Sequence, residues 1–167
     1  MTGMLLSIPF VSAECSRADG GGTAAIIRDH LLFLLHNGEA MAWQAYLAKA
    51  RNSLRTAQSV YEQGDSDSCA SRAYFAVFQA EIAALIKLTE FRQEQWRHDR
   101  VQAEFNRRLI HARKLFPASL RSIHYDLAGI RHTADYSDRV ISARTAEQCL
   151  GRAAEMLTNI VKALEEP

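Results

Sequence analysis

The sequence predicts an all-α protein, an up-and-down antiparallel bundle of about five helices. Three observations support this prediction. Apolar residues recur at helical spacing in several long segments, no segment has the strict alternation of a β-strand, and neither an internal repeat nor a Gly-rich phosphate loop is present. A chain of 167 residues with 48 % hydrophobic residues is long and apolar enough for a single domain with a sizeable core.

The segment 68–87 is expected to form the central helix. It contains no Gly or Pro and is rich in Ala, and Asp67 before it is a suitable N-cap residue. At about 100° per residue, apolar side chains cover most of the circumference and leave only a narrow polar stripe. A helix of this kind must be covered by neighbours on nearly every side.

One residue of this segment breaks the apolar pattern. Glu81 projects about 180° from Arg72, into the middle of the widest apolar sector. A buried carboxylate is costly unless it is protonated or meets a cation. Two interpretations are open: Glu81 reaches water at the rim past small Ala neighbours, or it pairs with a basic residue of another helix. Arg131 is the candidate on another helix, and Arg72 of the same segment is considered beside it.

Residues 1–40 have a different character from the rest of the chain. An apolar run at Met4–Val11 resembles the apolar part of a signal peptide, but no Lys or Arg precedes it. A second apolar run, 31–35, is far shorter than the roughly 20 residues of a transmembrane helix. We expect a poorly ordered or mis-annotated N-terminal extension, with the helical domain occupying 41–167; a secretory signal is the alternative.

The remaining helices are placed by periodicity and by stop signals. Gly64 ends a first helix that starts near Met41, and the short connection to the central helix makes the two an antiparallel hairpin. A third helix is expected from His98, a fourth with Pro117 in its first turn, and a last one over 145–165. The inward-facing residues of the last three helices are expected to be Val101, Phe105 and Leu109; Leu120, Ile123, Leu127, Ile130 and Ala134; and Cys149, Leu150, Ala153, Leu157, Ile160 and Leu164.

Charge and cysteine content exclude some classes of function. The net charge of +1 gives no global argument for nucleic acid or for a membrane surface, although a local basic face remains compatible with it. The three cysteines lack the paired spacing of a zinc site or a disulfide framework. We therefore expect no metal, no cofactor and no membrane association, and a cytoplasmic location.

A cluster of chemically active side chains, Arg131-His132-Thr133-Ala134-Asp135-Tyr136, closes the expected fourth helix. Arg131 and Asp135 are four residues apart, on one helix face, and so are His132 and Tyr136. Asp135 is therefore expected to pair with Arg131, or else with Arg72. A guanidinium, a carboxylate, an imidazole and a phenol within two turns can bind phosphate and move protons. Such clusters also form ordinary polar networks at helix ends.

Three ordered blocks of the sequence resemble the HEPN-domain family. They are residues 70–80, His98 with Val101 and Phe105, and the Arg131–Tyr136 cluster, which matches a small prokaryotic subgroup marked by an Arg-x-x-Ala-Asp-Tyr signature. The resemblance covers 41–166. It implies an up-and-down helical bundle, usually a homodimer, often encoded beside a minimal nucleotidyltransferase as the toxin half of a toxin–antitoxin pair.

Active toxins of this family carry an Arg followed, after a gap of four to six residues, by a His, and they cleave RNA without a metal. This chain departs from that pattern, because the positions after Arg131 at those gaps are Tyr136, Ser137 and Asp138. Arg92 and His98 have a gap of five, but they belong to the connection before the third helix, and we interpret their spacing as chance. The family's partner attaches AMP to a Tyr two residues after the His, so Tyr136 is at best a displaced acceptor.

Two functions follow as hypotheses. The chain is a toxin-like ribonuclease with altered site geometry, in which Arg72 helps Arg131 to form a positive cleft, or it is a non-catalytic module that docks a nucleotidyltransferase or a nucleotide through the same cleft. For His98 the alternatives are capping the third helix and joining the cleft. The catalytic candidates are Arg131, His132, Asp135 and Tyr136, the binding candidates are Arg72, Tyr74 and His98, and the basic residues expected to flank the site are Arg107, Arg108, Arg113, Lys114 and Arg121.

Overall fold

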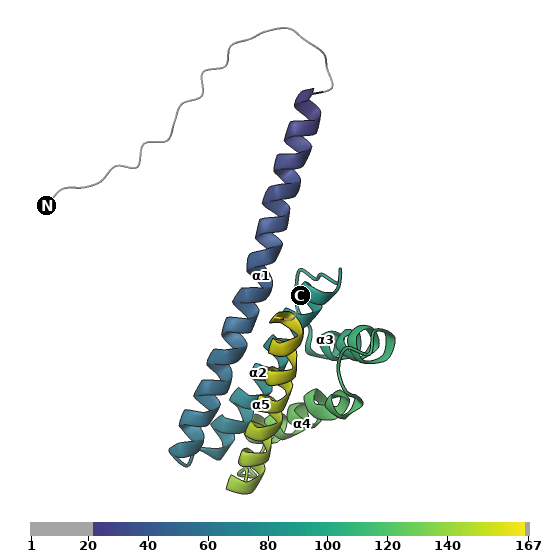
Figure 1. The fold of residues 1–167 in the computed structure, drawn as a ribbon. Helices are drawn as coiled ribbons and strands as arrows, with labels where there is room; N and C mark the ends of the chain where they lie inside the picture. Colours follow the sequence, from purple (N-terminus) through teal and green to yellow (C-terminus); the bar gives the residue numbers. More distant parts are fainter. Residues whose placement is uncertain (1–21, 166–167) are drawn as a thin grey trace, which may run out of the picture. The chain divides into compact units, whose positions relative to one another are not determined.

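A computed structural model describes residues 22–165, and within this range the chain is helical without strands, which confirms the all-α prediction. The chain divides into two units, Met1–Leu35 and His36–Pro167, and the candidate site lies in the second unit. The described elements are α1 (Gly22–Glu62), α2 (Ser66–Leu88), α3 (His98–Phe105), the π-helix η1 (Asn106–Ala112), the 3-10 helix η2 (Ala118–Ser122), α4 (Ile123–Tyr136) and α5 (Ala143–Glu165) (Figure 1).

Helix α2 is the central helix, as predicted. It packs against α3, α4 and α5, and a hydrogen bond of 2.8 Å between Ser53 Oγ and Gln79 Oε1 links it to α1. By length and composition it is apolar enough to cross a membrane, yet 83 % of the relevant window is buried inside the protein. Such burial is typical of the core helix of a globular domain.

The start of α2 differs from the prediction. Asp65 is the N-cap, and its carboxylate accepts a hydrogen bond of 3.0 Å from the backbone N–H of Ser68. Asp67, the expected cap, lies inside the first turn and accepts a hydrogen bond of 2.8 Å from the backbone N–H of Ile141, in the segment before α5. Gly64 ends the hairpin turn as predicted, with the left-handed φ of +84° that favours glycine.

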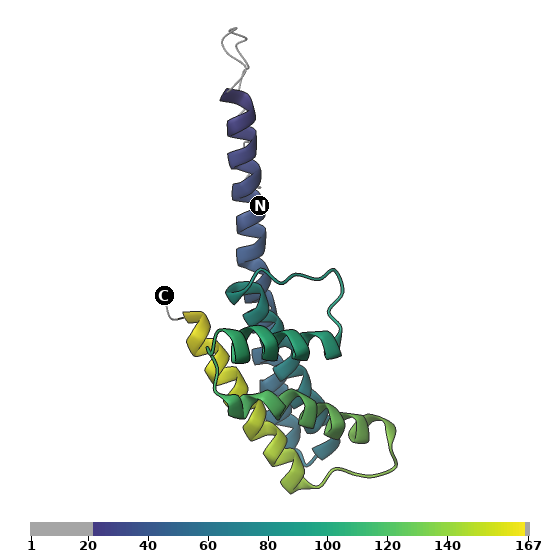
Figure 2. The ribbon, with the colours of Figure 1, turned by 90° about the vertical axis from the view of Figure 1, so that its right-hand side faces the viewer.

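Helices α3 and α4 both run across α2 (Figure 2), and α4 also packs against α5. Helix α3 begins at His98 as predicted and continues into η1, whereas the predicted fourth helix is divided into η2 and α4. Pro117 is the N-cap of η2 rather than a residue of its first turn. The inward stripes are confirmed by burial, except that Ile130, Ala134 and Leu150 are only partly buried.

The predicted N-terminal extension overlaps only in part with the described residues. Residues 1–21, including the signal-like run, lie outside them, and the backbone of 22–40 belongs to α1. The expected domain start at Met41 therefore falls inside a helix that begins at Gly22. Helix α5 begins at Ala143, two residues before the predicted Thr145.

Candidate functional site

Glu81 is buried in the core, with a relative exposure of 1 %. Its Oε2 lies 2.5 Å from Nδ1 of His124, which is itself 2 % exposed. The interpretation of Glu81 as a rim residue is therefore wrong, and so are Arg131 and Arg72 as its expected partners. The carboxylate is buried because α4 places an imidazole directly opposite it on α2, which supplies the partner that a buried charge requires.

The contact between Glu81 and His124 continues toward the surface. Nε2 of His124 lies 3.5 Å from Oη of Tyr74, a long contact, and that oxygen lies 2.5 Å from Nδ1 of His98. Tyr74 is buried, whereas His98 is exposed. Four residues from α2, α4 and α3 thus form one polar chain, which we call the inner chain, from a core carboxylate to an imidazole at the surface.

The environment of the inner chain shifts two of its pKa values. Burial raises the pKa of Tyr74 to about 12; the positive charge of Arg131 opposes this shift and the negative charge of Glu81 adds to it. The pKa of His98 lies below its usual 6.5, chiefly because of partial burial, with His124 and Arg131 adding to the effect and Asp99 opposing it. Neutral forms of both side chains are therefore favoured at pH 7.

His98 is held by its ring as well as by Nδ1. Its ring centre lies 4.1 Å from that of Phe78 and 5.5 Å from that of Tyr74. The N-cap position of α3 is taken by Arg97, without a side-chain capping bond. His98 therefore does not cap the helix. Its contacts are with Tyr74 and Phe78 of α2 instead.

Arg131 approaches the inner chain from α4. Its guanidinium carbon lies 5.9 Å from the ring centre of Tyr74 and 5.6 Å from that of Phe75, within cation–π range. Arg131 and His98 therefore contact the same tyrosine, the first through the ring and the second through the hydroxyl. The structure brings together an arginine and a histidine that are distant in sequence.

The predicted pair of Arg131 and Asp135 is present. Nε of Arg131 lies 2.5 Å from Oδ2 of Asp135, and each side chain is 26 % exposed. The Nε–H does not point at the carboxylate, so this buried nitrogen has no hydrogen-bond acceptor and the contact is an ion pair only. Asp135 therefore holds the guanidinium beside Tyr74 and Phe75 by charge, without a hydrogen bond from the Nε–H of Arg131.

The other candidates surround this centre. His132 is exposed and its ring contacts that of Tyr136 at 5.1 Å between centres. Tyr136 is 67 % exposed, and its ring centre lies 5.3 Å from the guanidinium carbon of Arg131. Arg72 is exposed and lies over Phe75, with 5.4 Å from its guanidinium carbon to the ring centre.

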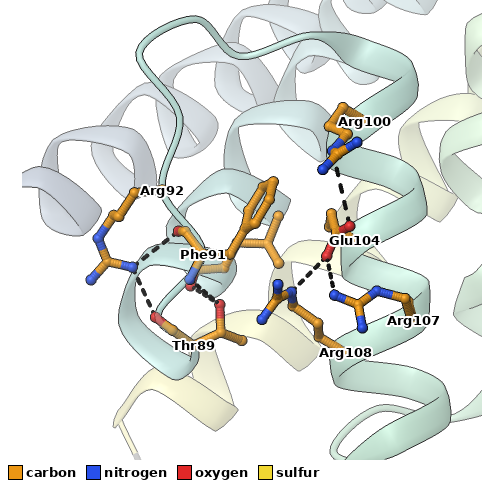
Figure 3. A network of polar contacts seen from close by, with 8 residues as sticks. Thr89, Phe91, Arg92, Arg100, Glu104, Arg107 and Arg108 are labelled. Carbon is orange, nitrogen blue, oxygen red and sulfur yellow. Dashed lines mark hydrogen bonds and ion pairs between the residues drawn. The ribbon is translucent and has the colours of Figure 1, made fainter.

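A second polar cluster lies on α3 and η1, the helical segment that begins with His98 (Figure 3). The carboxylate of Glu104 accepts hydrogen bonds of 2.7 Å from Arg107 and 2.6 Å from Arg108, and Nε of Arg100 is 3.9 Å away. These bonds, that of Arg107 first, lower the pKa of Glu104. We call these four residues the outer cluster.

Two further arginines use backbone acceptors. Arg92 donates hydrogen bonds of 2.8 and 3.0 Å to the carbonyl oxygens of Thr89 and Phe91 (Figure 3), and Arg113 donates one to the carbonyl of Leu88. Arg107, Arg108 and Arg113 of the expected flanking set thus have intramolecular partners. Within the side chains that the structure describes, no three His, Cys, Asp or Glu residues are placed to share a metal ion.

Sequence reasoning missed His124. A signal for it exists in the spacing of Leu120, His124, Leu127 and Arg131, because steps of four, three and four place residues on one helix face. This face is the one that buries Leu120 and Leu127. A histidine on the inward face and a carboxylate in an apolar sector of another helix together predict a buried pair.

Comparison with known proteins agrees with the geometry. The sequence matches a family model, the HEPN domain, over residues 43–164. The all-α domain described above, with a long apolar helix covered by its neighbours, is consistent with this match. The chain belongs to the HEPN family. No curated protein matches the sequence.

Proposed function

We propose that this protein is a metal-independent ribonuclease, the toxin-like component of a pair with a nucleotidyltransferase, acting as a homodimer in the cytoplasm. The observation that carries the proposal is the convergence of Arg131 and His98 on Tyr74. Ribonucleases of this family need an arginine and a histidine. This chain lacks the histidine at the family's spacing after Arg131, and His98 from α3 supplies one in space.

The geometry supports a transesterification, in which the ribose 2′-oxygen replaces the 5′-oxygen on the phosphorus of a phosphodiester. Arg131 binds the phosphate and stabilises the charge that builds up on its oxygens in the transition state. Nε2 of His98 removes the proton of the ribose 2′-hydroxyl. The 2′-oxygen then bonds to phosphorus while the bond to the 5′-oxygen breaks, and the leaving oxygen takes a proton from water. A 2′,3′-cyclic phosphate and a 5′-hydroxyl result.

The remaining candidates have supporting roles in this mechanism. Asp135 holds Arg131 in place, and its carboxylate is committed to that ion pair. Tyr136 and His132 are exposed beside Arg131 and line the approach of a nucleotide. The arginines of the outer cluster lie on α3 and η1, the helical segment that begins with His98, and their positive charges suit the RNA backbone.

A non-catalytic binding module is the second candidate function. The observation that favours it is the ion pair itself, because Asp135 offsets much of the charge that Arg131 would offer to phosphate. In that case the exposed Tyr136 and His132 contact the partner nucleotidyltransferase. The two candidates differ in whether loss of Arg131 abolishes a reaction.

The test is RNA cleavage by the purified full chain in the presence of a chelator. Arg131→Ala is expected to lower kcat by about 10²- to 10³-fold, and His98→Gln by about 10²-fold or more. Arg152→Ala is the matched control, because Arg152 also pairs with an α4 aspartate, Asp126, at 2.6 Å, and it should cleave like the wild type. Equal cleavage by wild type and Arg131→Ala contradicts the proposal, and absence of cleavage by every protein leaves the binding module.

Activity should also depend on pH in a defined direction. The pKa of His98 lies below its usual 6.5, so the imidazole is neutral and able to accept a proton at pH 7. Cleavage should therefore be retained at pH 7 and fall on acidification. Cleavage that does not fall on acidification contradicts His98 as the base.

A further inference from the structure

With Glu81 ionised, the inner chain has one arrangement of protons that satisfies every member with both histidines neutral. Nδ1–H of His98 donates to Oη of Tyr74, whose O–H donates to Nε2 of His124, whose Nδ1–H donates to Oε2 of Glu81. The opposite direction requires a proton on Glu81 or a second proton on His124. The first arrangement leaves the lone pair of His98 on Nε2, the nitrogen that makes no contact with Tyr74.

We propose that Tyr74, His124 and Glu81 are positioning residues that hold the Nδ1–H tautomer of His98 and receive the proton that His98 takes up. The inference deepens the proposed function, on which its second half rests. In water the Nε2–H tautomer of histidine is the commoner one, and it would present a donor where the reaction needs a base. Contact with the buried chain reverses this preference.

The proton transfer balances at each atom. Nε2 of His98 binds the proton of the 2′-hydroxyl, and Nδ1 passes its own proton to Oη of Tyr74. Tyr74 gives its original proton to Nε2 of His124 and stays neutral throughout. His124 becomes an imidazolium beside the Glu81 carboxylate, and His98 ends neutral with its proton on Nε2.

The charges around the chain favour this inward movement. His98 is faced by the cation Arg131 from α4 and by the carboxylate of Asp99 from its own helix, while Tyr74 and Glu81 on α2 and His124 on α4 complete its surroundings. Arg131 lies against Tyr74 and destabilises a second positive charge on His98. Beside His124, the nearest charge is the negative one of Glu81, at 2.5 Å.

Nitrogen-15 NMR of the histidine side chains in the full chain tests the inference without any need for activity. In the wild type, His98 should show a protonated Nδ1 and a bare Nε2 at pH 7.5. On acidification, the first proton should appear on buried His124 rather than on exposed His98. A wild-type His98 with its proton on Nε2, or one that takes up the first proton itself, overturns the proposal.

Two conservative variants sharpen the test. Tyr74→Phe removes only the hydroxyl and should return His98 to the Nε2–H tautomer. Glu81→Gln keeps an oxygen acceptor for His124 but removes the charge, so the tautomer should persist while the first proton is taken up at a lower pH. An unchanged His98 tautomer in Tyr74→Phe, or unchanged proton uptake in Glu81→Gln, contradicts the relay, and cooperative unfolding of each variant shows that it is folded.

Cleavage measurements separate this inference from the proposed function. If the wild type cleaves RNA, Glu81→Gln should lower kcat at least about tenfold with little change in KM, because the base is impaired and the binding surface is not. An active wild type whose His98 has the Nε2–H tautomer overturns the relay alone. The expected NMR pattern in a protein that does not cleave RNA supports the arrangement of protons and contradicts the ribonuclease.

Discussion

Among the side chains that the structure describes, two carboxylates are buried, and they are stabilised in opposite ways. Glu81 of the inner chain is 1 % exposed and meets His124, a residue 43 positions away on another helix. Glu104 of the outer cluster is 9 % exposed and meets arginines three and four positions along its own helical segment. The first pair forms only when helices pack, whereas the second forms wherever the segment is helical.

This difference governs what each carboxylate contributes. Burying Glu81 and His124 costs desolvation that their mutual contact has to offset, so the pair specifies how α2 and α4 meet more than it adds stability. Glu104 keeps its arginines at the surface, where a single ion pair contributes little to the free energy of unfolding. The inner chain is suited to holding a defined geometry, and the outer cluster to holding charge at the surface.

The largest expected effect comes from breaking the inner pair. Glu81→Ala leaves His124 buried without its partner and should lower the free energy of unfolding by about 3–5 kcal/mol, measured by urea denaturation. The double variant Glu81→Leu/His124→Leu should recover most of this loss, because two apolar side chains need no partner. A double variant as unstable as the single one would show that packing, not the unpaired group, causes the loss.

A smaller effect is expected for the outer cluster as the pH changes. The arginines hold the pKa of Glu104 below its usual 4.5, so its contribution to stability is present above pH 4.5 and is lost as the pH falls below that value. Glu104→Gln should therefore lose less stability than the wild type over this acidic range, in urea denaturation at several pH values. If the free energy of unfolding fell equally with pH in the two proteins, a stabilising ion pair at Glu104 would be contradicted.

The smallest effects should come from single arginines of the outer cluster. Arg108→Met leaves Glu104 bonded to Arg107 and should cost about 0.5 kcal/mol. This cost should shrink further at high salt, because surface charges are screened, while the cost of Glu81→Ala should stay unchanged. If the loss of stability in Glu81→Ala also changed with salt concentration, the distinction between the two carboxylates would be contradicted.

The fold was predictable because its signals are local. Helical periodicity placed the helices, and the left-handed Gly64 marked the turn between the first two. Element starts were less predictable: Asp65 and Asp67 both suit an N-cap, and only the hydrogen bond from Ile141 shows why Asp67 is used elsewhere. The split of the fourth helix into η2 and α4 left no local signal that we recognised.

The candidate site was predictable only in part. The spacing of Arg131 and Asp135 predicted their ion pair, and the apolar surroundings of Glu81 indicated that this carboxylate needs a partner. The spacing of His124 with Leu120 and Leu127 marks it as an inward-facing candidate partner. That this histidine and Glu81 actually meet depends on how α4 crosses α2. The same holds for His98, whose meeting with Tyr74 is created by packing alone.

The apolar circumference of α2 also has a consequence for the order of folding. Helix α2 needs α5 to bury part of its apolar surface, and α5 begins more than 50 residues after α2 ends. A nascent chain on the ribosome therefore exposes an apolar helix until α5 has emerged. Such a chain is a client for chaperones during its synthesis. A chain ending at Ser142 should accordingly bind a hydrophobic dye and lack a cooperative unfolding transition; normal unfolding of that fragment would show that α3 and α4 suffice as cover.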